Sequence, residues 1–259
     1  EVAVGRFLPV EELIAAKLDT LFVGMIVEEW TPFRVSRNAD INVEEDEADD
    51  LLEAVETELR RQRFNKAVRL EVAHDVGPEL RDLLVRELEL THDDVTYHRT
   101  LIDLSCLLDL MAIDRPDLKD EPWPAVTAGR LVAAEDADRP IFEVMRHRSI
   151  LLHHPYESFS TSIEEFIAQA ANDSKVKSIK MTMYRAGGDS AIIRSLIRAA
   201  EQGKQVAVLV ELKARFDEAT NVQWAKQLER AGVHVVYGMV GLKTHSKVVL
   251  VVRDDGDKL

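Results

Sequence analysis

The sequence has one cysteine, few aromatic residues and no long apolar run. One cysteine cannot form an intrachain disulfide, which favours a cytoplasmic compartment where thiols stay reduced. Cys106 itself lies in an apolar stretch and is expected to be an ordinary core residue. The longest apolar runs have the length of a strand, far below the roughly 18 to 20 residues of a spanning helix. We therefore expect no membrane-spanning segment.

An excess of positive charge is also lacking, because 47 Asp and Glu outnumber 33 Lys and Arg and the net charge is −14. Such a protein repels a polyanion, and 6% aromatic residues are too few for a base-stacking platform, so we expect no nucleic-acid partner. Asn172 to Lys247 nevertheless holds 13 Lys/Arg against 7 Asp/Glu, whereas the remainder holds 20 against 40. This contrast favours a confined anion site. The alternative is that these bases belong to solvated helix faces.

The first half of the chain alternates between strand and helix patterns. Apolar periodicity predicts strands at Phe33–Arg37, Ala67–Val72 and Val95–His98, and helices at Glu44–Arg63, Pro78–Leu90 and Leu101–Leu110. This order is typical of an α+β layer with split βαβ character. Prolines between Ala112 and Pro140 repeatedly interrupt regular structure, so we place a domain boundary there.

The second half predicts an α/β domain with a mainly parallel sheet. A capping-box pattern at Thr161-Ser-Ile-Glu predicts the start of a first helix. Strands are then expected at Ser178–Met183, Gln205–Leu212, Val233–Tyr237 and Lys247–Val252, separated by helices Ser190–Gln202 and Asp217–Arg230. The strand from Gln205 is nearly all apolar, which indicates a sheet buried on both faces. His234, inside another apolar strand, is expected in the core.

Cationic side chains gather where the predicted strands end. The set comprises Arg185, Lys213, Arg215, Lys243, His245 and Lys247. Because ligands bind outside the carboxyl ends of strands in open α/β sheets, we expect these residues to converge. Arg can grip phosphate oxygens in pairs, Lys adds a point charge, and Gly187-Gly188 would let backbone N–H groups approach an anion.

His245 is the candidate nucleophile of this set. Neutral imidazole can attack phosphorus, and neighbouring cations would stabilise charge on the equatorial oxygens. In a His-x-Lys unit at the start of a strand, His245 and Lys247 share a face. The alternative for Arg185 and Arg215 is a surface salt bridge with Asp189 or Asp217. His153-His154-Pro155 could be a metal pair, but the proline favours a turn.

Four segments in order resemble polyphosphate kinase, a bacterial family built on a phospholipase-D-like fold. They are Leu152-His-His-Pro-Tyr-Glu-Ser-Phe, Lys180-Met-Thr-Met-Tyr-Arg, Glu211-Leu-Lys-Ala-Arg-Phe-Asp-Glu and Gly241-Leu-Lys-Thr-His-Ser-Lys. Phe33-Arg-Val-Ser-Arg-Asn-Ala-Asp resembles the family's helical domain. The resemblance implies that residues 1–139 form an α+β middle domain for oligomerisation, truncated at its N-terminus. Residues 140–259 would be the first phospholipase-D-like catalytic domain, truncated at its C-terminus.

The resemblance implies reversible transfer of the terminal phosphate of ATP to inorganic polyphosphate through a phosphohistidine at His245. ADP would be the product, Mg²⁺ would accompany ATP, and the enzyme would be a homo-oligomer. His245 and Lys247 would be catalytic, and the phosphate-binding residues would be Arg185, Arg215, Lys213 and Lys243. The family's magnesium site falls on Arg185 and Arg215. A guanidinium group has no lone pair for a metal, so we expect both to contact phosphate oxygens.

Two departures from these families matter. The phospholipase-D pattern expects Asp five residues after the lysine, where this chain has Val252. This weakens the alternative of a phospholipase-D-like phosphodiesterase or nuclease that uses His245. A non-catalytic interaction module is a third alternative, against which the clustered cations speak. The polyphosphate kinase family also has an N-terminal domain and a second C-terminal domain, so we expect a central fragment that is inactive alone.

Overall fold

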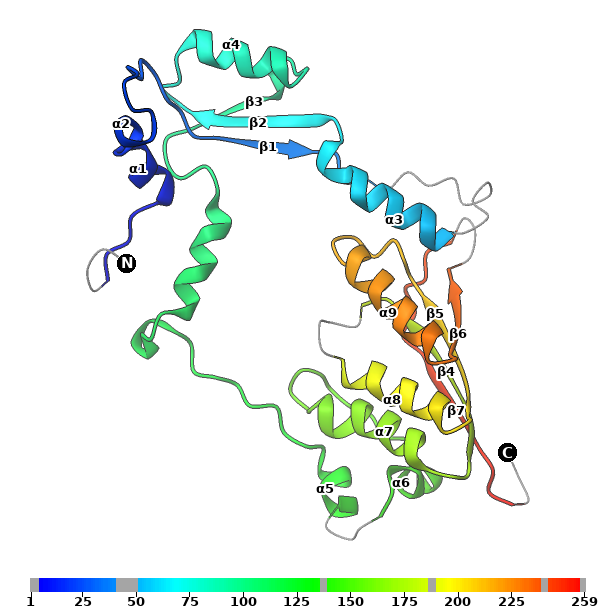
Figure 1. The fold of residues 1–259 in the computed structure, drawn as a ribbon. Helices are drawn as coiled ribbons and strands as arrows, with labels where there is room; N and C mark the ends of the chain where they lie inside the picture. Colours follow the sequence, from blue (N-terminus) through cyan, green and yellow to red (C-terminus); the bar gives the residue numbers. More distant parts are fainter. Residues whose placement is uncertain (1–4, 41–50, 136–138, 186–189, 239–241, 257–259) are drawn as a thin grey trace. The chain divides into compact units, whose positions relative to one another are not determined.

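The computed structural model describes residues 5–40, 51–135, 139–185, 190–238 and 242–256 (Figure 1). Contacts group Glu1–Asp40 with Arg61–Asp117 in one unit, and Ile41–Arg60 with Leu118–Leu259 in another. Residues 118–139 thus group with the second unit. The domain boundary expected between residues 139 and 140 stays a prediction. No described helix is long and apolar enough to cross a membrane.

The first unit is built on a three-stranded sheet in the order β1-β2-β3. β1 (Phe33–Arg37) runs antiparallel to β2 (Ala67–Ala73), which runs parallel to β3 (Val95–His98). Helix α4 (Pro78–Glu87) connects β2 to β3 and buries Val85 against them. β2 and β3 are direct neighbours, so the βαβ unit is not split and that prediction is wrong.

The remaining elements of this unit are short. They are α1 (Val10–Ala15), α2 (Leu18–Leu21) and the 3₁₀ helices Gln62–Phe64, His92–Asp94, Leu104–Ala112 and Pro116–Leu118. The apolar helix predicted near residue 101 forms as the 3₁₀ helix Leu104–Ala112, which buries none of its residues. Cys106 is exposed, so the predicted core position is wrong. An apolar stretch shows which residues could be buried, but it does not supply the surface that covers them.

The second unit contains a four-stranded sheet in the order β6-β5-β4-β7. β4 (Val176–Met183), β5 (Gln205–Val210) and β6 (His234–Tyr237) are parallel. β7 (Val249–Arg253) pairs antiparallel with β4. The predicted mainly parallel α/β sheet is therefore confirmed.

Helices cover one face of this sheet (Figure 1). α7 (Glu165–Asn172), α8 (Ala191–Glu201) and α9 (Glu218–Arg230) bury apolar side chains in its core, as does α3 (Leu51–Arg61). α8 and α9 connect successive parallel strands, and right-handed crossovers place both on the same side. A smaller cluster joins α5 (Gly129–Glu135) to α6 (Ile141–His147).

The other face of the sheet is less covered in the described chain. Along β5, Val206, Val208 and Val210 are buried, whereas Ala207 and Leu209 are only half-buried. Next to Ala207, His234 is exposed on β6. The expectations of a sheet buried on both faces and of a core position for His234 are therefore wrong. The helices fill one side only, and strand apolarity alone does not reveal this.

The entry into α7 also differs from the prediction. A π-helical turn, Ser160–Glu164, precedes the α-helix, so Thr161 lies inside helical structure and is not its cap. Ser158 takes the capping role, because its hydroxyl accepts a hydrogen bond from the Thr161 amide at 3.2 Å. The predicted capping box at Thr161 is wrong by a few residues. Sequence patterns often misplace helix ends in this way.

An ion pair links strand β7 of this sheet to the end of helix α7. The guanidinium of Arg253 on β7 lies 2.7 Å from the carboxylate of Asp173, which follows α7, and each side chain is 20% exposed. Burial by itself would raise the pKa of the Asp173 carboxyl. Hydrogen bonds from Arg253 and from the Lys175 amide outweigh it, so the pKa lies below its ordinary value.

We expect Asp173→Asn to destabilise the second unit by about 1 to 3 kcal/mol at pH 7. A carboxyl whose pKa is lowered by folding stabilises the folded state above its unfolded pKa of about 3.9, and this contribution disappears as pH falls through the lower folded value. Urea unfolding at several pH values should show the difference shrinking below about pH 4. Exposed Asp120→Asn is the matched control. An equal loss at pH 7 and pH 2 would contradict this account.

Candidate active site

Four of the predicted site residues gather around the ring of Tyr184, which directly follows β4. The imidazole of His245 packs edge-on against it, with ring centroids 4.9 Å apart. The ammonium nitrogens of Lys247 and Lys243 lie 4.7 and 5.9 Å from the ring centre, and the guanidinium carbon of Arg185 lies 5.3 Å away. An aromatic face attracts cations, so one tyrosine helps to hold several positive side chains together.

Sheet pairing explains why these residues meet. Met181 of β4 pairs with Val249 of β7, so the segment just before β7 runs beside the end of β4. The hydroxyl of Thr182 extends this pairing, donating to the Ser246 carbonyl at 2.7 Å and accepting from the Val248 amide at 2.9 Å. The segment carrying His245 is thereby held next to Tyr184, although it lies outside the strand.

Arg185 makes two contacts with the loop that follows β5. Its Nε lies 2.5 Å from a carboxylate oxygen of Asp217, and its Nη2 donates to the Arg215 carbonyl at 2.8 Å. The salt bridge foreseen as an alternative role for Arg185 therefore exists with Asp217. Its side chains are 51% and 35% exposed, so it contributes only about 0 to 1 kcal/mol. Two of the five guanidinium N–H donors are used by these contacts, and an anion could engage others.

The other predicted cations lie nearby on the same loops. The Lys243 ammonium donates to the Lys213 carbonyl at 3.0 Å. Arg215 is exposed, with its guanidinium carbon 5.5 Å from the ring of Phe216. Phe216 has φ of 73°, a left-handed conformation that is uncommon for a bulky residue and typical of tight turns at functional sites. Asp189 and Gly187-Gly188 lie outside the described residues.

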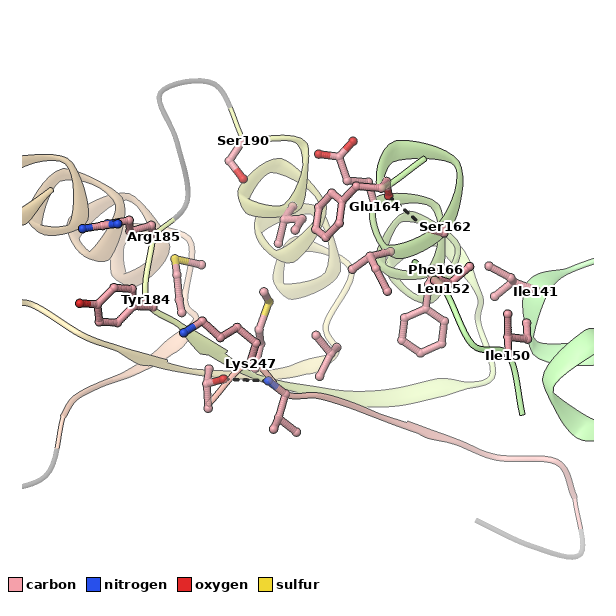
Figure 2. Close-up of a pocket in the computed structure, with 18 of the residues that line it drawn as sticks. Ile141, Ile150, Leu152, Ser162, Glu164, Phe166, Tyr184, Arg185, Ser190 and Lys247 are labelled. Carbon is pink, nitrogen blue, oxygen red and sulfur yellow. Dashed lines mark hydrogen bonds between the residues drawn. The ribbon is translucent and has the colours of Figure 1, made fainter. Parts of the chain in front are cut away.

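Three predicted site residues line one cavity of about 790 Å³, namely Arg185, His245 and Lys247. Figure 2 shows Tyr184, Arg185 and Lys247 at one end and Phe166, Leu152, Ile150 and Ile141 at the other. Lys213, Arg215 and Lys243 are not among its lining residues. The cavity therefore has a cationic end and an apolar end. His245 is exposed there, as a nucleophile must be.

The donor atoms of the predicted site residues decide whether these residues can bind a metal ion. Arg185 and Arg215 do not fit Mg²⁺, because guanidinium offers no lone pair to a metal. Among the described residues, no cluster of three His, Cys, Asp or Glu could hold an ion. His153 and His154 enter a turn, as predicted, where the His154 ring bonds to the Glu157 carbonyl at 2.8 Å.

Sequence reasoning assigned no role to several residues that build this site. Tyr184 stands at the end of a predicted strand, and this position could have marked it as a residue of the site. Thr182 is one β-strand residue among many, and nothing in its neighbourhood marks its double hydrogen bond. Glu211 and Asn221 also join the loops of the site. A charged residue at the end of an apolar strand was the signal for Glu211.

We expect Thr182→Val to destabilise the unit by about 0.5 to 1.5 kcal/mol, because it removes the two exposed hydrogen bonds that join the Thr182 hydroxyl to the Val248 amide and the Ser246 carbonyl. Hydrogen exchange should be faster at the Val248 amide, while amides in the middle of β5 keep their protection. Thr182→Ser retains the hydroxyl and should behave like the wild type. Equal exchange at Val248 in both variants would show that the hydroxyl does not hold this segment.

Comparisons with known proteins agree with the predicted family. Residues 2–110 match the polyphosphate kinase middle domain, and residues 140–259 match the polyphosphate kinase C-terminal domain 1. Polyphosphate kinase of Mycobacterium tuberculosis (strain ATCC 25618 / H37Rv) is 54% identical over 251 residues, covering 97% of this chain and 34% of the relative. That of Mycolicibacterium gilvum (strain PYR-GCK) is 52% identical over 256 residues, covering 99% and 35%.

A solved structure shows the same fold. The crystal structure of polyphosphate kinase from Porphyromonas gingivalis matches with a TM-score of 0.65 and 27% identity, covering 94% of this chain and 33% of that one. The predicted phospholipase-D-like α/β fold is thus confirmed. The chain spans about a third of the length of these relatives. The matches favour the kinase interpretation over a phosphodiesterase, and the chain belongs to the polyphosphate kinase family.

Proposed function

We propose that the full-length protein transfers the terminal phosphoryl group of ATP reversibly to inorganic polyphosphate through a phosphohistidine at His245. One observation carries this proposal. The exposed imidazole of His245 shares a cavity with the cationic side chains of Arg185 and Lys247. Relatives that are more than half identical are named polyphosphate kinases, which supports the same reaction class.

The proposed chemistry has two balanced steps. In the first, a lone pair on an imidazole nitrogen of His245 attacks the γ-phosphorus, the bond to the bridging oxygen breaks, and ADP leaves with that electron pair. In the second, a terminal oxygen of polyphosphate attacks the same phosphorus. The P–N bond then breaks and the imidazole regains its lone pair. In the reverse reaction ADP accepts the phosphoryl group. ADP and polyphosphate both end in a phosphate group, so the same protein side chains serve both directions.

The cations have two tasks in this proposal. Arg185 and Lys247 line the cavity of His245, where they would stabilise charge on the equatorial oxygens of the moving phosphoryl group. Lys213, Lys243 and Arg215 lie on the adjoining loops, outside the cavity lining. Polyphosphate carries negative charge along its whole length, so cations beyond the reacting group can bind the rest of the chain. Magnesium would be carried by the nucleotide phosphates, since the arginines are unsuited to bind it.

Incubating the full-length protein with γ-labelled ATP tests the intermediate. We expect acid-labile, base-stable label on the wild type and its loss, by at least about 100-fold, in His245→Ala, because no other group replaces a removed nucleophile. His234→Ala is the matched control, since that histidine is exposed on β6. Label retained by His245→Ala would contradict the assignment. Cleavage of phosphodiesters without any labelling would contradict the kinase reaction.

Binding measurements test the proposed phosphate contacts. Charge-assisted hydrogen bonds contribute about 1.5 to 3 kcal/mol, so Arg185→Ala and Arg215→Ala should each weaken polyphosphate binding by about 10- to 100-fold. Arg198→Ala, exposed on α8, should bind like the wild type. Titration calorimetry of the full-length variants with polyphosphate gives the dissociation constants. Unchanged affinity in both site variants would place the phosphate elsewhere.

A further inference from the structure

Glu211 is a buried carboxylate in the middle of this cationic site. It directly follows β5, is only 6% exposed, and its own amide donates to the Met183 carbonyl at 2.9 Å. Burying a charged group is unfavourable unless hydrogen bonds replace its hydration. The partners of this carboxylate therefore indicate its role.

Both carboxylate oxygens accept backbone hydrogen bonds from separate loops. One oxygen accepts from the Thr244 amide at 2.7 Å, and the other accepts from the Lys213 amide at 3.0 Å. Thr244 is the residue immediately before His245, whereas Lys213 lies in the loop after β5. A single side chain thus joins the segment of the candidate nucleophile to a segment of the candidate phosphate site.

Asn221 ties a third loop to the same place. This α9 residue is fully buried, and its amide nitrogen donates to the Tyr184 carbonyl at 2.7 Å and to the Glu211 carbonyl at 2.9 Å. Both neighbours are acceptors, which requires the nitrogen of the side chain to face them. Glu211 and Asn221 together connect the loops after β4, after β5 and before β7.

The sheet alone does not hold these loops. The pairing of β4 with β5 ends at Met183 and Val210, and the pairing of β4 with β7 ends at Met181 and Val249. His245 lies beyond both ends. Thr182 restrains the side of its segment nearer β7, and the Glu211 carboxylate restrains the other side through Thr244. The backbone on both sides of the histidine is therefore fixed by side chains.

We propose that Glu211 is a positioning residue, whose carboxylate orients the His245 imidazole by holding the preceding amide. This inference rests on the proposed function of His245. Glu211 itself contacts no reacting atom and acts through the histidine. A displacement of about 1 Å can slow an enzyme by about 100-fold, so its effect should appear in the rate rather than in ATP affinity.

The test is Glu211→Gln in the full-length protein, because the isostere keeps the shape but one of its two acceptor atoms becomes a donor. We expect phosphohistidine formation at saturating ATP to slow by about 10- to 100-fold. The ATP concentration giving half-maximal rate should change by less than about threefold, since Glu211 is not placed against the phosphates. Glu201→Gln, exposed at the end of α8, is the matched control and should react like the wild type.

A second variant and a second readout separate positioning from folding. Glu211→Asp keeps the charge but is too short to reach both amides, so it should slow the reaction similarly. In both variants hydrogen exchange at the Thr244 amide should accelerate, while β5 amides stay protected. If the wild type forms phosphohistidine and either variant forms it at the wild-type rate, the positioning role of Glu211 is overturned while the proposed function of His245 stands. If the wild type forms no phosphohistidine, the proposed function fails. Independently of that result, unchanged hydrogen exchange at the Thr244 amide in the variants would overturn the Glu211 contact.

Discussion

The pairing of β7 with β4 is the constraint on which the site depends. It brings a segment from late in the sequence alongside the end of β4, where Tyr184 stands. Without this pairing, His245 and Lys247 would have no reason to share a cavity with Arg185. The hydroxyl of Thr182 and the carboxylate of Glu211 then refine a position that the sheet sets only coarsely.

The positive charges of this site are balanced by nearby carboxylates. Several cations lie around one aromatic ring in a protein whose net charge is −14. Their mutual repulsion is offset locally by Asp217, paired with Arg185, and by the buried carboxylate of Glu211. The exposed pair is weak enough for a phosphate to displace it. The buried carboxylate is hydrogen-bonded to backbone amides and is better suited to a permanent structural role.

Much of the fold followed from periodicity. Strands and helices alternate clearly in the second half, and the predicted parallel pairing of β4, β5 and β6 is present. The wrong predictions concern burial, which depends on what packs against a helix or strand. Cys106 and His234 are in apolar stretches, yet both are exposed, because burial depends on a covering surface that local sequence does not encode.

The same limit applies to the site. Strand ends identified Arg185, His245 and Lys247, since loops at one sheet edge converge whatever their details. Asn221 could not be found in this way, because it lies inside a helix, in the first turn of α9, and acts through two distant carbonyls. Interactions between backbone groups and remote side chains leave no periodic trace in a sequence.

The reversed direction of β7 has one more consequence. His245 lies ahead of its strand and is anchored by β7, Thr182 and Glu211. Because β7 enters the sheet antiparallel, residues that precede it stand at the same edge as residues that follow the parallel strands β4 and β5. The site therefore draws its side chains from the entrance of one strand and from the exits of its neighbours.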